Sequence, residues 1–272
     1  MRHSEGRAIR PDGLPTTTGM TPSQWIYSGL AADTYDLWFG DEPFWDQTFF
    51  SECIAGNGGA ALELACGTGR LLVPFLRDGL DVEGTDASPE MLDICRRKAA
   101  AQDVKAVLHL QLMQDLAIPR RFRTIYIPAQ SFQIIADRRE AMQVLVRSRD
   151  HLEARGGELI VTLGQTWNEP GADGEERMIR SVTRGDGSVA RVFSSRRMIH
   201  AERIQELSVR FETVSNGLVT ASLTWPATRL RWYEPDEFTS MLRDAGFESV
   251  QMRVGYDGQS SPDADLIFQA RR

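Results

Sequence analysis

The pattern of apolar and polar positions repeats between residue 60 and about residue 163 as short apolar runs separated by helical spacing. The runs predict buried strands at 60–65, 80–85, 104–112, 123–128 and 158–163. The spacing between them predicts helices at 70–77, from Ser88 onward, and at 137–152. Strand–helix–strand repetition of this kind predicts an α/β fold with a doubly wound, mostly parallel sheet and helices on both faces.

Polar residues mark where two of these helices begin. Ser88 offers a capping hydroxyl, and Pro89 stands at the first helical position. Asp137 precedes Glu140 by three residues, in the manner of a capping box.

The pattern changes after residue 165. Residues 166–176 are typical of a loop, and the next segment, Arg177 to Tyr233, contains three or four strand-like runs. Asn216-Gly217 between two such runs is a strong hairpin signal, so an antiparallel β insertion is expected. The α/β pattern then resumes with a helix at 235–245 and strands near 249–254 and 265–270.

The amino-terminal sequence divides into two parts. Residues 1–20 are polar and predict a mobile tail, whereas residues 21–56 are dense in aromatic side chains and predict a helical cap. The expected organisation is therefore a tail (1–20), a helical cap (21–56), a core (57–165 and 234–272) and a lid made by the antiparallel insertion (166–233).

The composition limits which binding partners and which cellular compartment are expected. The chain has 272 residues, 42% of them hydrophobic and 25% charged, which is ordinary for a globular protein. A net charge of −7 argues against nucleic acid as a partner. No apolar segment resembles a signal peptide or reaches the ~20 residues of a membrane helix, so no membrane association and a cytoplasmic location are expected. The three cysteines have no metal-binding spacing, and no metal is predicted.

The sequence from Glu63 to Arg70, ELACGTGR, ends the first predicted strand and carries the clearest chemistry. Gly67 and Gly69 allow a tight turn and close approach of a ligand to the backbone. Asp86 ends the second predicted strand, where a carboxylate can accept both hydroxyls of a ribose. Leu72 occupies the third glycine position of the dinucleotide pattern, which favours an adenosyl site over a pyrophosphate cradle.

These motifs resemble the class I S-adenosylmethionine-dependent methyltransferases, in particular the small-molecule and natural-product branch. The resemblance runs from about Tyr27 to Gly164 and from Trp232 to the end. It is carried by ELACGTGR, by GTDASPEML at 84–92, and by the segments at 115–122, 127–132 and 155–157. It implies a Rossmann-like fold, S-adenosyl-L-methionine as cofactor and a small-molecule acceptor.

The resemblance also implies roles for individual residues. Asp86 would hold the ribose, with Ala87 and Met91 against the adenine. Gly67 and Gly69 would border the methionyl and ribose parts, and Glu63 would orient the glycine turn or reach the amino group through water. The amino acid end would meet the backbone of the following residues: Ala65, Pro128 and Ala129.

Two positions affect how the adenine and the methyl group are held. The family often has an Asp that accepts from the adenine amine, but here Leu112 stands at that position, followed by Met113. Gln111, Gln114 or water would then substitute. Tyr27 matches an amino-terminal tyrosine that covers the cofactor and is the first candidate near the methyl group, although ordinary aromatic packing is an equal alternative.

The acceptor side is less constrained by the sequence. His200 lies in the insertion and is either a general base or, more simply, a surface residue; His3, His109 and His151 are expected to be structural or exposed. Gln130, Arg180 and Trp232 are candidate acceptor-binding residues.

The resulting hypothesis is a methyltransferase that modifies an O, N or C atom of a small molecule. A non-methylating relative that binds the same cofactor and a nucleotide-dependent oxidoreductase are the alternatives. The oligomeric state stays open, with a homodimer as one option.

Overall fold

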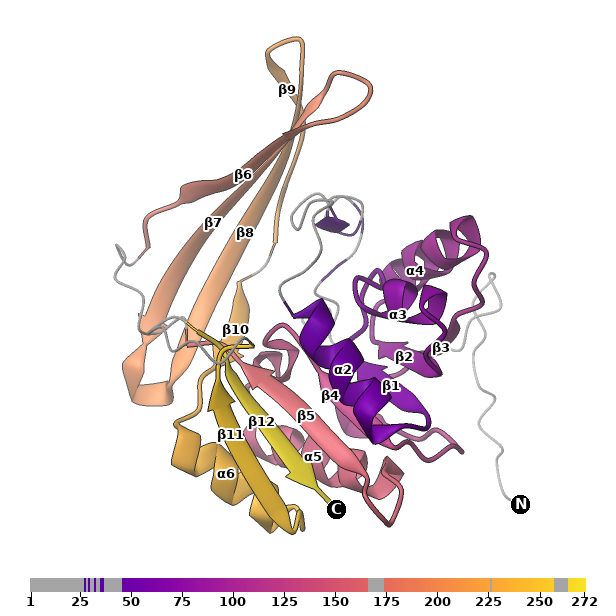
Figure 1. The fold of residues 1–272 in the computed structure, drawn as a ribbon. Coiled ribbons are helices and arrows are strands. Elements are labelled where there is room, and N and C mark those ends of the chain that lie inside the picture. Colours follow the sequence, from indigo (N-terminus) through magenta and orange to yellow (C-terminus); the bar gives the residue numbers. More distant parts are fainter. Residues whose placement is uncertain are drawn as a thin grey trace, which may run out of the picture.

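The computed structural model describes residues 27, 29, 32, 35–36, 46–165, 174–225, 227–256 and 264–272 (Figure 1). The predicted tail, most of the predicted helical cap and most of the loop at 166–176 lie outside these residues. None of the described helices combines the length and the apolar character needed to cross a membrane.

A seven-stranded sheet forms the centre of the molecule. Its strands are β1 (Ala61–Leu64), β2 (Val82–Asp86), β3 (Val107–Leu110), β4 (Thr124–Ile127), β5 (Glu158–Leu163), β11 (Ser249–Val254) and β12 (Leu266–Arg271). The order across the sheet is β11-β12-β5-β4-β1-β2-β3. The strands from β3 to β5 are parallel, and β12 runs antiparallel to both of its neighbours. The predicted α/β class with a mostly parallel sheet is therefore confirmed.

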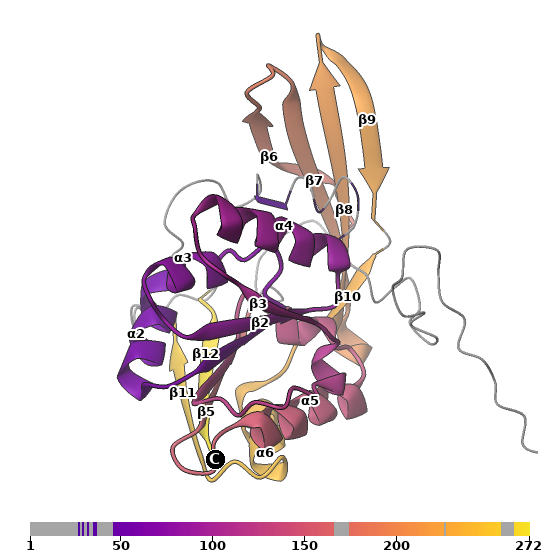
Figure 2. The same ribbon diagram turned by 90° about the vertical axis from the view of Figure 1, so that its right-hand side faces the viewer.

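Helices cover both faces of this sheet, as Figure 2 shows. One face packs against α2 (Gln47–Asn57), α3 (Leu72–Arg77) and α4 (Pro89–Ala101), and the other against α5 (Arg138–His151) and α6 (Pro235–Asp244). The two faces bury separate apolar clusters, with Phe50 and Cys95 on the first and Val144 and Phe238 on the second.

The predicted helix starts are realised by the expected side chains. The Ser88 hydroxyl accepts from the backbone N–H of Met91 at 3.2 Å, and Pro89 begins α4. The Asp137 carboxylate accepts from the N–H groups of Arg139 and Glu140 at the start of α5. Each cap satisfies donors that the first helical turn leaves without partners.

A second, antiparallel sheet projects from the first (Figure 1). It contains β6 (Arg177–Thr183), β7 (Val189–Ile199), β8 (Ile204–Ser215), β9 (Leu218–Thr224) and β10 (Thr228–Arg231), in the order β10-β8-β7-β6 with β9 also paired to β8. The sequence predicts three or four strands here, and the structure has five. Asn216 and Gly217 have φ values of 51° and 78°, which is the conformation of a two-residue hairpin turn between β8 and β9.

The second sheet is attached to the carboxyl edge of the first. The Gln133 side chain accepts from the N–H of Gly164, which follows β5, at 2.7 Å. The same side chain donates to the carbonyl of Arg231, at the end of β10, at 3.2 Å. Gln133 thus ties β10 to the edge where the parallel strands end and where α/β folds place their ligands.

Candidate functional site

The two glycines of the turn after β1 have different surroundings. A Cβ on Gly67 would lie 3.7 Å from Met91 Cε and 3.9 Å from Tyr35 Cε1, so it would fill the space between these side chains. A Cβ on Gly69 would lie 2.6 Å from the sulfur of Cys95, inside the protein. Both have a positive φ, 54° and 81°, which disfavours any L side chain. Gly67 therefore lines the site, whereas Gly69 allows α3 to pack on α4.

Asp86 holds the glycine turn with both oxygens. One oxygen accepts from the N–H of Gly67 at 2.9 Å, and the other accepts from the N–H of Ser88 at 2.8 Å. Burial raises the pKa of the Asp86 carboxyl, and the backbone N–H donors oppose that shift. Each oxygen keeps a lone pair beyond the N–H that it accepts, so a diol can still be bound.

Two tyrosines of the amino-terminal segment lie against the turn. The rings of Tyr27 and Tyr35 meet edge to face at 5.0 Å, and the carbonyl of Tyr27 accepts from the Ser88 hydroxyl at 2.6 Å. Burial, and then the charge of Asp86, raise the pKa of Tyr27 to about 12, so its phenol stays protonated at neutral pH. Thr68 in the turn also donates to Asp36 at 2.6 Å.

A buried polar layer supports the turn from below. The Glu63 carboxylate accepts from the Tyr126 hydroxyl at 3.0 Å, and Arg70 makes two contacts of 2.6 Å with the Asp46 carboxylate. Glu63 is 2% exposed, and burial raises the pKa of its carboxyl well above the usual range. The side chain of Glu63 is thus packed inside the protein beneath the turn, with the hydroxyl of Tyr126 as its partner.

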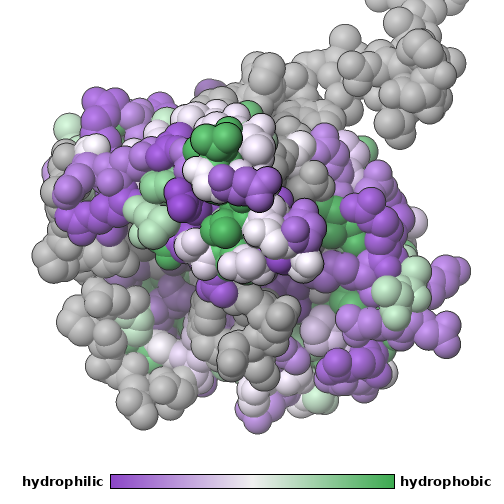
Figure 3. Space-filling view, turned by 90° about the horizontal axis from the view of Figure 1, so that it is seen from above, coloured by the Kyte–Doolittle hydropathy of each residue, from purple (hydrophilic) through white to green (hydrophobic). Residues whose placement is uncertain are grey.

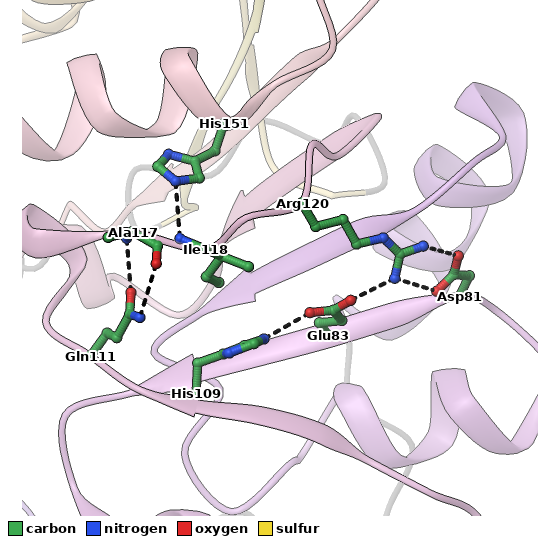
Figure 4. A network of polar contacts seen from close by, with 8 residues as sticks. All are labelled: Asp81, Glu83, His109, Gln111, Ala117, Ile118, Arg120 and His151. Atoms are coloured by element: carbon green, nitrogen blue, oxygen red, sulfur yellow. Dashed lines mark hydrogen bonds and ion pairs between the residues drawn. The ribbon is translucent and has the colours of Figure 1, made fainter.

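The two glutamines after β3 differ in what they contact. The Gln111 amide accepts from the N–H of Ala117 at 2.9 Å and donates to its carbonyl at 3.4 Å, which closes the loop on itself (Figure 4). Gln114 is 6% exposed, and its side-chain oxygen has no partner within the described part of the chain. Met113 between them points into the core. A buried acceptor without a partner is costly, which makes Gln114 a candidate for a ligand contact.

Two of the four histidines have structural partners, as predicted (Figure 4). His109 lies 2.7 Å from the carboxylate of Glu83, and the same carboxylate accepts a hydrogen bond from Arg120. His151 accepts from the N–H of Ile118 and donates to the carbonyl of Arg147. His3 lies outside the described residues.

The inner face of the second sheet covers Tyr27. The ring of Tyr27 packs against an apolar cluster of β7 and β8 that includes Val192 and Val209, and its centre lies 6.1 Å from that of the Trp225 ring. The indole N–H of Trp225 is buried and has no partner among the described residues. Arg180 on β6 stands directly opposite Val192, so it shares the face that covers Tyr27.

The other acceptor candidates lie at the base of the second sheet. Trp232 is 7% exposed and meets the ring of His200 edge to face at 5.8 Å. His200 follows β7, in the hairpin that leads to β8. The structure therefore places His200 beside Trp232.

Gln130 follows β4 in a left-handed conformation, with a φ of 64°. The side-chain amide of Gln130 lies against Gly164, where an added Cβ would be only 2.1 Å from that amide. The amide nitrogen is 3.5 Å from the carboxylate of Asp265.

Residues 61–156 match a family model described as "Methyltransferase domain". This stretch contains the glycine turn, Asp86 and Gln114, which are the centre of the site described above. The chain therefore contains a methyltransferase domain, and its resemblance to the S-adenosylmethionine-dependent methyltransferases is confirmed.

Individual relatives cover different shares of this methyltransferase. The dTDP-3-amino-3,4,6-trideoxy-alpha-D-glucopyranose N,N-dimethyltransferase of Streptomyces venezuelae is 27% identical over 187 residues, which are 66% of this chain and 76% of that protein. The putative methyltransferase YqeM of Bacillus subtilis is 25% identical over 118 residues, so the alignment spans 47% of its length. The solved structure of the CcbJ methyltransferase from Streptomyces caelestis superposes with a TM-score of 0.74 at 24% identity, covering 91% of this chain and 98% of that one, and shows the shared fold.

Two polar residues of this methyltransferase were not predicted from the sequence. Asp265 precedes β12 and accepts from the Tyr256 hydroxyl at 3.1 Å, and Tyr256 packs on the ring of Phe49 at 5.6 Å. In the sequence, the only signal for Asp265 is an acidic residue directly before an apolar run. The position of Asp265 depends on the pairing of β12 with β5, which the neighbouring residues in the sequence do not reveal. Across the described ranges, no cluster of three His, Cys, Asp or Glu side chains is placed to hold a metal ion.

Proposed function

We propose that this methyltransferase transfers a methyl group to the amine of a small acceptor of the amino-sugar kind. The observation that carries the proposal is the bracing of Gly67 by Asp86 beside the Tyr27–Tyr35 pair, with Tyr27 packed in turn against the second sheet. The nitrogen acceptor is supported by the Streptomyces venezuelae relative, which is an N,N-dimethyltransferase of a nucleotide-linked amino sugar.

The residues present fit S-adenosylmethionine on three counts. Asp86 has lone pairs left for the ribose hydroxyls, and the buried Gln114 oxygen has no partner among the described residues and suits the adenine amine. Gly67 leaves open the space between Met91 and Tyr35 that a side chain would fill. When bound, the cofactor supplies a methyl group made electrophilic by its sulfonium.

The remaining contacts to the cofactor would come from residues at the carboxyl ends of the strands. Ala87 and Met91 would flank the adenine, and the backbone of Ala65, Pro128 and Ala129 would meet the amino acid end. Ala65 and Ala129 have positive φ values of 59° and 52°, which turn the backbone sharply where β1 and β4 end.

The protein's own contribution to the reaction is alignment and exclusion of water. Tyr27 and Tyr35 present aromatic rings, whose faces attract a cation such as a sulfonium. Methyl transfer requires the nucleophile, carbon and sulfur in line, and positioning supplies much of the barrier reduction. The protonated phenol of Tyr27 is suited to shield and orient rather than to accept a proton.

The second sheet, within the lid proposed for residues 166–233, would cover the acceptor. Four residues on it or beside it would contribute: Arg180 as a fork-shaped donor, Trp225 as an apolar wall, and Trp232 with His200 at the base of the sheet.

The proposed function is tested with a matched pair of acceptors. Purified protein is incubated with S-adenosylmethionine and either dTDP-3-amino-3,4,6-trideoxy-α-D-glucopyranose or its 3-hydroxy counterpart, and the products are weighed by mass spectrometry. We expect the mass gain of one or two methylenes on the amine and none on the alcohol. Methylation of the alcohol alone, or of neither compound, contradicts the proposal.

A further inference from the structure

Asp265 stands at the same edge of the main sheet as Asp86 but on the opposite side of the glycine turn. β12 is antiparallel to β5 with Leu266 opposite Leu163, so Asp265 lies beside the residue that follows β5. The order β12-β5-β4-β1-β2 separates the two carboxylates by four strand spacings, or about 19 Å. A cofactor that extends from β2 across β1 to β4 leaves the β5 and β12 end for the acceptor.

The surroundings of Asp265 differ from those of Asp86. Asp86 is held by two backbone N–H groups, whereas two side chains donate to Asp265: the Tyr256 hydroxyl at 3.1 Å and the Gln130 amide at 3.5 Å. Gln130 belongs to the end of β4, so it links the carboxylate to the strand beside the glycine turn. Asp265 is partly exposed and can therefore meet a ligand.

The groups around Asp265 also set its protonation. Burial raises the pKa of its carboxyl, the hydrogen bonds from Tyr256 and Gln130 lower it, and the charge of Asp46 raises it. Among the described residues, Tyr256 at the end of β11 and Asp46 before α2 are thus the titratable groups that act on it, and Asp46 is itself paired with Arg70. The net effect is a carboxylate that is more basic than an exposed Asp.

We infer that Asp265 holds the ammonium group of the acceptor and takes one proton from it before methylation. The N–H bond breaks, a new O–H bond forms on the Asp265 carboxylate, and the nitrogen keeps the electron pair that makes it a nucleophile. A carboxylate attracts an ammonium through a charge-assisted hydrogen bond, and a partly buried one binds it more strongly than an exposed one. This inference rests on the proposed amine acceptor.

Binding is measured by calorimetry in the presence of S-adenosylhomocysteine, with the same amino sugar and its hydroxy counterpart as probes. Asp265→Asn is expected to weaken binding of the amine about 10- to 100-fold and to leave binding of the alcohol nearly unchanged. Asp244→Asn, on the exposed end of α6, is the matched control and should leave both affinities unchanged.

The outcomes separate this inference from the proposed function. Wild-type affinity for the amine in Asp265→Asn overturns the inference alone, as does a weakened affinity for S-adenosylhomocysteine, which would place Asp265 on the cofactor side. A wild-type protein that does not bind the amine overturns the proposed function and this inference with it.

The pH dependence of kcat/KM gives a second readout. The wild-type profile should have an acidic limb at the pKa of Asp265, and Asp265→Asn should remove that limb while Asp265→Glu partly restores turnover. Tyr256→Phe removes a hydrogen bond that lowers the pKa, so its limb should move to higher pH. Unchanged profiles in Asp265→Asn and Tyr256→Phe would overturn the role of Asp265.

Discussion

The two sheets of this methyltransferase differ in how much of each strand is buried. In β1, β4 and β5 of the main sheet every residue is buried, whereas in β9 of the second sheet every residue is exposed. Leu218 and Val219 at the tip are 72% and 54% exposed. From above, the hydrophobic residues of the visible face form separate patches among hydrophilic ones (Figure 3). Truncated side chains should therefore destabilise the fold more in the main sheet than at the exposed tip of the second sheet.

The inner face of the second sheet packs against the amino-terminal segment that lies over the main sheet. Trp225 and the apolar cluster around Val209 pack on Tyr27, which in turn lies beside Asp86. Cofactor binding should therefore depend on the main sheet, and acceptor recognition on the second sheet and on the edge at Asp265.

Truncation of a core side chain should affect stability far more than truncation at the tip. Phe268 on β12 is fully buried and packs 4.8 Å from Phe238, so Phe268→Ala should reduce the free energy of unfolding by about 3–5 kcal/mol. Leu218→Ala should change it by less than about 0.5 kcal/mol. Urea denaturation measures both, and equal losses would mean that the second sheet is part of the stabilising core.

Removal of the Asp86 carboxylate, which we propose holds the ribose, should specifically weaken cofactor binding. Asp86→Ala is expected to cost about 1.5–3 kcal/mol of binding free energy for S-adenosylhomocysteine, because a charge-assisted partner is lost. Calorimetric titration checks this, with Arg180→Ala as the variant that should keep the wild-type affinity. Wild-type affinity in Asp86→Ala would remove Asp86 from the site.

The ring of Tyr27, rather than its hydroxyl, should matter for turnover. Tyr27→Phe keeps the packing on Trp225 and should retain most of the activity, whereas Tyr27→Ala should lose much more. Steady-state kcat values with the amine acceptor measure the difference. An equally large loss in Tyr27→Phe would show that the hydroxyl itself takes part.

The smallest effect is expected at His200. Because the structure places it at the hairpin beside Trp232, His200→Ala should lower acceptor turnover modestly and leave cofactor affinity unchanged. Loss of the acidic limb of the pH–rate profile in this variant, with the limb retained in Asp265→Asn, would instead make His200 the base.

Local patterns were sufficient to predict much of the cofactor half. The caps at Ser88 and Asp137 and the turn at Asn216-Gly217 depend on residues close in sequence. The parallel direction of most strands in the main sheet followed from strand–helix alternation, and β5 and β11 have the expected bounds.

The proposed acceptor side of the site depends on contacts between residues far apart in the sequence, and the neighbouring residues do not indicate such contacts. Asp265 meets Gln130 across 135 positions, only because β12 inserts antiparallel beside β5. The sequence likewise left Gln111 and Gln114 as equal candidates for the adenine amine. In the structure the two differ because the backbone of Ala117 hydrogen-bonds the side-chain amide of Gln111, whereas the side-chain oxygen of Gln114 has no partner among the described residues.

The most direct test of the division between the two sheets is a crystal structure with S-adenosylhomocysteine bound. We predict the ribose hydroxyls on Asp86, the adenine amine on the side-chain oxygen of Gln114, and the sulfur beneath Tyr27, pointing toward Gln130 and Asp265. A ligand whose ribose lies away from Asp86, or whose sulfur points away from Gln130 and the second sheet, would contradict the account.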